Sequence, residues 1–179
     1  MNGVRPDLDR EELAALVCAT LDRHGVRVVL SGGGAASIYA PNRYESMDLD
    51  FIAVGLSRKV DSAMHELGFA KERQRHWTHP DSRFWVEFPP GPVQVGDEVV
   101  HTFAERRTAL GTLRILTPTD CVLDRLAWFY HARDEQGLEQ AVAVAAAHAI
   151  DLERVERWSA RERKSAEFER FRALLRAEI

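Results

Sequence analysis

The apolar positions in the first part of the chain change from a helical period to a strand period and back. Between residues 10 and 24 they recur three or four apart, and an Asp-x-x-Glu start signal at Asp9 precedes them. Residues 26–30 are almost wholly apolar, which is typical of a central strand. Residues 48–54 are a second predicted strand, and Ser57 begins another helix that Gly68 ends. The pattern predicts a first helix that packs on a sheet.

Short strands are predicted through the middle of the chain. Within residues 83–88 the side chains of Phe84 and Val86 fall on one face, so Glu87 points to the other. The prolines after this strand end it, because proline cannot continue a sheet ladder. The predicted strands are residues 69–78, 83–88, 99–103 and 113–116.

The pattern becomes helical at Thr117 and stays so to the last residue. Thr117 is an N-cap residue and Pro118 takes the first helical position. Breaks are expected near Gly137, at residues 150–151 and at residues 159–163. The fold class is therefore α/β (α+β), with a sheet domain over residues 1–116 and a helical extension over residues 117–179 packed on it.

Composition narrows the class of protein. The chain has 179 residues, 45% of them hydrophobic, and a net charge of −4 with acids and bases mixed. A protein that coats nucleic acid would be strongly basic, so that class is disfavoured. Cys18 and Cys121 fall in separate helical segments and are expected to be buried thiols. We expect no membrane segment, because the longest apolar run, residues 141–147, is too short to span a bilayer. We expect a cytoplasmic location, because no signal peptide is visible.

Candidate chemistry gathers between residues 28 and 51. Asp48 and Asp50 lie one residue apart on a predicted strand, so both carboxylates face the same way, about 7 Å apart. Paired carboxylates suit a divalent cation such as Mg²⁺ or Mn²⁺. The preceding turn, Ser31-Gly32-Gly33, lets a backbone approach an anion at a helix start. Metal and phosphate together indicate a nucleoside triphosphate (NTP) site, although an ordinary turn and a solvated carboxylate pair are the competing interpretation.

This stretch resembles the nucleotidyltransferase fold of the DNA polymerase beta superfamily. Within it, residues 26–54 look closest to the small abortive-infection and antitoxin-type nucleotidyltransferases. The resemblance implies a mixed sheet and helices beside it. The matching positions are Leu30, Gly32, Gly33, Ala35, Arg43, Ser46, Asp48, Leu49 and Asp50.

The resemblance also implies roles for single residues. Asp48 and Asp50 would bind the metal, and Glu87 would be the third carboxylate, as ligand or base, at a place where the family usually has aspartate. Arg43 and Ser46 would contact the triphosphate, or merely cap their loop. Ser31, Gly32 and Gly33 would shape the phosphate turn, and Arg125 would reach the triphosphate from the helical extension or pair with Asp124 at the surface.

The implied reaction is metal-dependent transfer of a nucleoside monophosphate from an NTP to a hydroxyl. By resemblance the acceptor is a tRNA end, a partner protein in a toxin–antitoxin system, or a small molecule such as an aminoglycoside. A second hypothesis is a nucleotide-binding or interaction module that has lost turnover, which the glutamate at Glu87 favours. A third is a helical ribonuclease that uses Arg125 and His131. The basic stretch 71–83, with Trp77, could receive RNA or a partner protein, or be a solvated hairpin.

Overall fold

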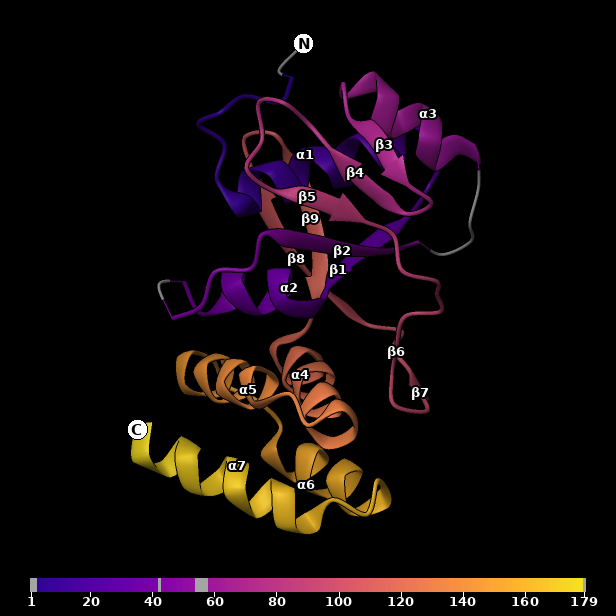
Figure 1. The fold of residues 1–179 in the computed structure, drawn as a ribbon. Coiled ribbons are helices and arrows are strands. Elements are labelled where there is room, and N and C mark those ends of the chain that lie inside the picture. The colour runs from indigo at the N-terminus through magenta and orange to yellow at the C-terminus, as the bar shows by residue number, and fades with distance from the viewer. Residues whose placement is uncertain (1–2, 42, 54–57, 179) are drawn as a thin grey trace.

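The computed structural model describes residues 3–41, 43–53 and 58–178, and within them a sheet domain is followed by four helices (Figure 1). The strands are β1 (Val28–Ser31), β2 (Asp48–Ala53), β3 (Ala70–Arg73), β4 (His76–Thr78), β5 (Trp85–Glu87), β6 (Gln94–Val95), β7 (Glu98–Val99), β8 (Phe103–Thr108) and β9 (Gly111–Leu116). The helices are α1 (Arg10–Arg23), α2 (Gly32–Tyr39), α3 (Arg58–Glu66), α4 (Pro118–Ala132), α5 (Glu135–Ala147), α6 (Leu152–Arg161) and α7 (Ser165–Glu178).

Seven of the strands form one mixed sheet in the order β3-β4-β5-β2-β1-β9-β8. β1 and β9 run parallel, as do β2 and β5, while the other neighbours are antiparallel. The central strand β1 is buried along its whole length, and in β2 Leu49, Phe51 and Ala53 are buried between less buried neighbours. This confirms the predicted mixed α/β fold and the inward direction of Leu49.

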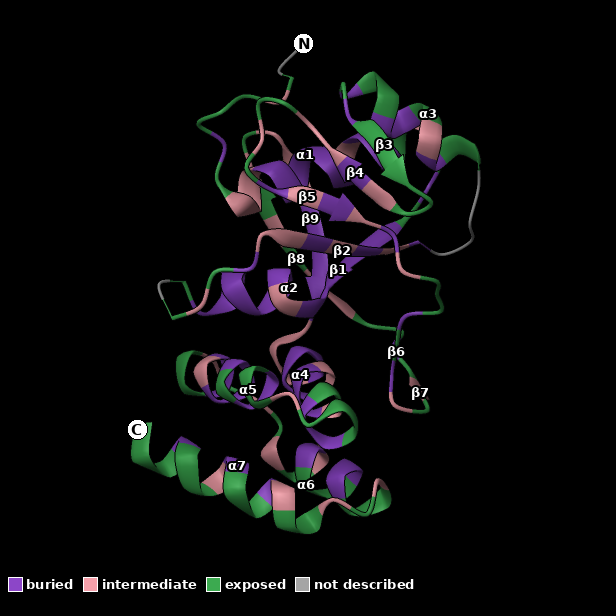
Figure 2. Cartoon of the chain, viewed as in Figure 1, coloured by how far each residue is buried: buried purple, intermediate pink, exposed green. Residues whose placement is uncertain are grey.

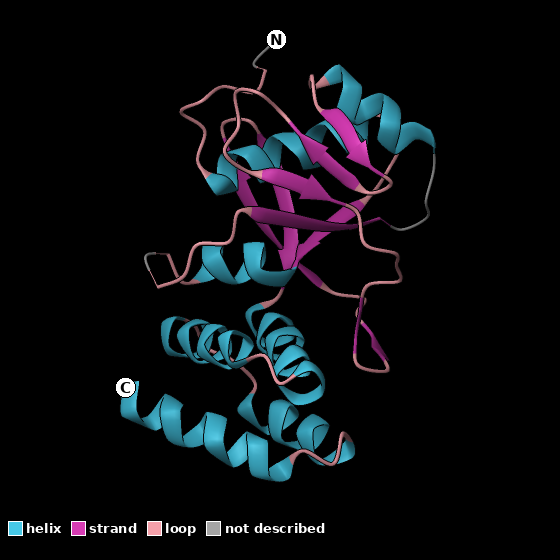
Figure 3. Ribbon diagram, viewed as in Figure 1, coloured by secondary structure: helices cyan, strands magenta, loops and turns pink. Residues whose placement is uncertain are grey.

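The helices cover the sheet unequally. α1 and α3 lie against one side, while α2 lies on the other, between the sheet and the helical extension (Figures 1 and 3). α4 and α5 pack on α2, and α6 and α7 lie on the far side of them. The sheet centre and the facing sides of the helices are buried, while the outer side of α7 is largely exposed (Figure 2).

Local signals explain where the helices begin. Asp9 and Glu12 form the expected capping box at α1, and Thr117 Oγ1 accepts from the Asp120 N–H at the start of α4. The helix start predicted at Ser57 lies outside the described residues, but α3 and its end near Gly68, with φ of +84°, match. Both cysteines are buried and free, as expected.

Three predicted elements are wrong in detail. Residues 69–78 are two strands of a hairpin rather than one strand, because the chain turns at Gln74 and Arg75. The strand predicted at residues 99–103 is replaced by the β6–β7 hairpin and by β8, which runs on to Thr108. The break predicted near Gly137 falls at Arg133 and Asp134, so Gly137 lies inside α5, where a Cβ would come 2.7 Å from the Arg125 carbonyl oxygen. The glycine permits close packing of α4 on α5.

Candidate active site

A cleft of about 360 Å³ opens between the sheet domain and the helical extension. Its sheet-side wall is the β1–α2 turn and the first half of β2, and its other wall is made by α4 and α5. Seven of the predicted site residues line it: Ser31, Gly32, Gly33, Ser46, Asp48, Asp50 and Arg125. The sequence pattern therefore indicated most of one wall and a single residue of the other.

The two aspartates stand side by side on the face of β2 that the core does not use. Asp48 Oδ1 is buried and has no hydrogen-bond partner. Burial, followed by repulsion from Asp48 and Glu87, raises the pKa of Asp50 to about 7, against a small opposing effect of Arg125. Burial and Glu87 also raise the pKa of Asp48. Partly buried carboxylates that repel one another and leave an oxygen unpaired are the donor set that a divalent cation neutralises, so the residues fit Mg²⁺ or Mn²⁺.

The glycine turn is shaped to approach this pair. Gly32 has a φ of +69°, and a Cβ on it would lie only 2.4 Å from Asp50 Oδ2. A Cβ on Gly34 would lie 2.7 Å from the Asp48 carbonyl oxygen. Ser31, directly before the turn, donates its hydroxyl to the Asp50 carbonyl at 3.2 Å. The start of α2 can therefore lie against β2 only because these positions have no side chain.

A chain of hydrogen bonds joins the turn to the strand. Ser37 donates to the Gly33 carbonyl oxygen at 2.8 Å and accepts from the Ser46 N–H at 2.9 Å. Ser46 Oγ in turn accepts from the Asp48 N–H at 3.2 Å. Ser46 is buried, so its hydroxyl fixes the entry to β2, which is the capping alternative of the two roles considered for it.

Glu87 lies on the expected face but not in the cleft. β5 runs parallel to β2 with Glu87 opposite Asp50, so the two side chains leave the same face of the sheet. The carboxylate is turned to the neighbouring strand, where Glu87 Oε1 lies 2.7 Å from His76 Nδ1. Within residues 3–41, 43–53 and 58–178, no three His, Cys, Asp or Glu side chains are gathered as a metal site. The third-ligand role of Glu87 therefore stays a prediction.

Arg43 and Arg125 are placed very differently. Arg43 forms an ion pair with Glu178 at the end of α7 and lines a neighbouring pocket of about 330 Å³ instead of the cleft. Arg125 is buried in the cleft wall, where Asp124 accepts from its Nε at 3.0 Å and its Nη2 at 2.7 Å. Its Nη1 donates to Gln140 at 3.2 Å. The predicted pair with Asp124 exists, but it is buried rather than at the surface.

Several lining residues were not foreseen. They are Tyr44, Ile52, Pro89, Asp124, Trp128, Asp134, Gln136 and Gln140. Asp124 and Trp128 are four residues apart and thus share one side of α4, a spacing that could have indicated them. Gln140 is a polar residue directly before the alanine- and valine-rich run of α5, and this position was the other available signal.

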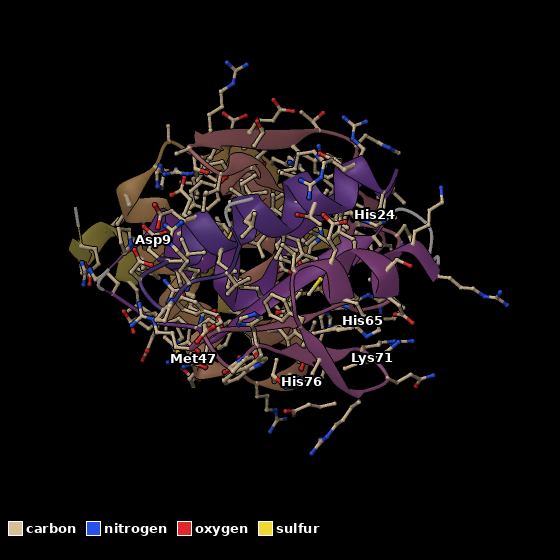
Figure 4. All side chains as sticks on the ribbon, turned by 90° about the horizontal axis from the view of Figure 1, so that it is seen from above. Asp9, His24, Met47, His65, Lys71 and His76 are labelled. Carbon is tan, nitrogen blue, oxygen red and sulfur yellow. The ribbon has the colours of Figure 1, made fainter. Side chains whose placement is uncertain are left out.

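Other predicted features lie away from the cleft. Trp77, in the basic hairpin, is 1% exposed and packs under Lys71, whose Nζ is 5.1 Å from its ring, so it offers no surface for an RNA base. Lys71 and His76 lie on this edge of the molecule (Figure 4). His131 pairs with Glu162, at 2.9 Å, and not with Arg125. No helix in the part of the chain that the structure describes is long and apolar enough to cross a membrane.

Comparison with known proteins agrees with this geometry at the level of fold. No protein-family model matches the chain, and no curated protein sequence matches it. Among solved structures, it is similar to the solution structure of the antibiotic-resistance factor ANT(2'')-Ia, an aminoglycoside nucleotidyltransferase. The TM-score is 0.50 at 14% identity, over 89% of this chain and 91% of that one. The chain thus has a nucleotidyltransferase fold, whereas membership of the polymerase-beta superfamily and closeness to its abortive-infection and antitoxin types stay predictions.

Proposed function

We propose that the protein is a metal-dependent nucleotidyltransferase that moves a nucleoside monophosphate from an NTP to a hydroxyl group. The observation that carries the proposal is that Asp50 Oδ2 lies against the glycine turn and the unpaired Asp48 Oδ1 belongs to the neighbouring carboxylate of the same cleft. A divalent metal bound there would neutralise phosphate charge and polarise the α-phosphate.

The chain's own groups then have separate tasks. Asp48 and Asp50 would hold the metal, and the open backbone at Gly32 and Gly33 would let the triphosphate approach. Arg125, held by Asp124 and Gln140, would balance the charge of the triphosphate. The acceptor oxygen would form a bond to the α-phosphorus as the bond to the bridging oxygen of the β-phosphate breaks and pyrophosphate leaves. Glu87 would take the hydroxyl proton after its carboxylate turns from His76 towards the cleft.

Charge favours one of the three acceptor classes. The cleft and the adjoining pocket, which share Tyr44 and Gln140, present six carboxylates and two guanidinium groups. Asp124 pairs with Arg125 and Glu178 with Arg43, and Asp48 and Asp50 would hold the metal, so Asp134 and Glu139 are the remaining acids. A tRNA end would be repelled by this lining, while a small molecule with amino groups would be attracted. We therefore take a small cationic molecule with hydroxyl groups as the acceptor, and an aminoglycoside is the first to test, given the activity of ANT(2'')-Ia. The acids are Asp48, Asp50, Asp124, Asp134, Glu139 and Glu178, and the bases are Arg43 and Arg125.

The test is transfer of label from α-³²P-NTP in the presence of Mg²⁺ or Mn²⁺, with aminoglycosides, tRNA and protein as separate acceptors. We expect a labelled small molecule with the wild type and none with Asp48→Asn. Label on tRNA or on a protein would instead support the toxin–antitoxin role that the sequence resemblance implied.

One observation favours the second candidate, a binding module without turnover. The Glu87 carboxylate lies against His76 and does not line the cleft. In that case the wild type would bind NTP with metal but transfer label to no acceptor, and Glu87→Gln would change nothing. An active enzyme would lose transfer in Glu87→Gln while it kept NTP binding.

A further inference from the structure

We propose that Trp128 is the platform on which the nucleobase of the bound NTP stacks. This inference rests on the proposed function and adds to it the position of the base, which none of the carboxylate, glycine or arginine contacts determines. It also predicts that the protein binds nucleotides with any base and favours purines.

The exposure of Trp128 is unusual among the tryptophans of this chain. Its exposed fraction is 54%, whereas Trp77 and Trp158 are each 1% exposed. An indole of this size left in water forgoes a large burial energy, and an exposed aromatic at the edge of a polar cleft is a feature of ligand sites.

The backbone and Cβ of Trp128 are nevertheless held firmly. A Cβ added to Gly137 would lie 3.5 Å from the Trp128 Cβ, so α5 packs closely against the start of this side chain. The Trp128 carbonyl oxygen accepts from the N–H of Arg133 and, at 3.4 Å, from that of Asp134. The α4–α5 turn thus holds the Trp128 backbone in place, which lowers the entropy lost when a ligand stacks on the indole.

Its position fits a base rather than a phosphate. Trp128 lies one helical turn beyond Arg125 on α4, which is about 4.5 Å along the helix axis. It lines both the cleft and an adjoining shallow hollow whose other residues are Ala127, His131 and Ala132. A triphosphate near Asp48 and Arg125 would thus have its ribose in the cleft mouth and its base over the hollow.

The residues that line the hollow favour binding of a nucleobase over binding of a cationic acceptor. No carboxylate lines it, and two of its four residues are alanines. Amino groups are drawn instead to the pocket at the other end of the cleft, where Glu139 and Glu178 lie. An apolar floor beside an aromatic face is suited to a flat, uncharged ring, and stacking tolerates any base while favouring purines for their larger area.

The experiment measures Mg²⁺-dependent binding of a non-hydrolysable ATP analogue and of inorganic tripolyphosphate to the full chain. For Trp128→Ala we expect the ATP analogue to bind about 5- to 150-fold more weakly, the range for loss of one base stack. Tripolyphosphate, which has no base, should keep its affinity. Trp128→Phe should restore most of the lost affinity and abolish the part of the tryptophan fluorescence quenching that the ATP analogue causes through Trp128. Val99→Ala, at another exposed apolar residue, should change neither affinity.

Two results would overturn the assignment of Trp128. One is equal weakening of the analogue and of tripolyphosphate, which would mean a general distortion of the cleft. The other is unchanged analogue binding with weaker binding of a cationic acceptor, which would assign the indole to a cation–π contact. Failure of the proposed function gives a different pattern. Without a nucleotide site the wild type would bind neither the analogue nor tripolyphosphate, and a binding module without turnover would keep the Trp128 pattern but transfer no label.

Discussion

Replacing Gly32 by alanine should damage the site more than the fold. With φ at +69°, an alanine there is expected to cost about 1–2 kcal/mol of stability from the backbone alone. For a chain of this size that corresponds to a fall in Tm of about 2–8 °C. The new Cβ would also lie 2.4 Å from Asp50 Oδ2, so the carboxylate must move by about 1 Å to reach an ordinary contact. A displacement of that size in a catalytic group can cost about 100-fold in rate.

Gly25→Ala is the matched control. Gly25 has nearly the same φ, +72°, but a Cβ there meets only Lys59 Nζ, at 3.5 Å. Both variants should therefore lose similar stability in a thermal melt, while only Gly32→Ala should lose Mg²⁺-dependent NTP binding in a calorimetric titration. If Gly32→Ala binds NTP as tightly as Gly25→Ala does, the claim that Gly32 is required for the placement of Asp50 is refuted.

Three further predictions follow from buried groups. The pKa of Asp50 is raised to about 7, so between about pH 4 and pH 7 the metal-free folded state holds a proton that the unfolded state has lost, and the stability of the protein should fall as pH rises through this range. Asp50→Asn should flatten this part of a curve of Tm against pH, and an unchanged curve would contradict the raised pKa of Asp50. Ser37→Ala should cost about 1–3 kcal/mol in urea unfolding, because it leaves the buried Ser46 N–H without its partner, whereas exposed Ser62→Ala should cost little. A fragment of residues 117–179 should give no cooperative melt, because α4 and α5 bury their apolar side against α2, and a sharp transition would show that it is an independent domain.

The glycine turn and the aspartate pair could be predicted because their signals are local. Gly32 directly follows β1, whose last residue, Ser31, pairs with Asp50 of the antiparallel neighbour β2. Both the turn residues and the alternation of β2 are visible in a short stretch of sequence. The fold class followed from the same stretch together with the helical pattern after Thr117.

What could not be predicted depends on contacts between distant segments. Arg43 pairs with Glu178, 135 positions away, and no local pattern indicates that. The predicted strands 69–78 and 83–88 do pair, as β4 with β5, and this places His76 opposite Glu87. That the Glu87 carboxylate contacts His76 rather than the cleft is a side-chain contact, which strand alternation does not indicate. The second wall of the cleft is set by how α5 packs on α4.

The most direct test of the central claim is calorimetric titration of the protein with Mg²⁺ and a non-hydrolysable NTP. The wild type should bind the nucleotide only with the metal, and Asp48→Asn combined with Asp50→Asn should weaken that binding at least about tenfold, since two of the carboxylates that hold the ion lose their charge. Asp81→Asn, at an exposed aspartate away from the cleft, is the matched control and should bind as the wild type does. Equal affinity of the double variant and the wild type would contradict a metal-dependent nucleotide site at Asp48 and Asp50.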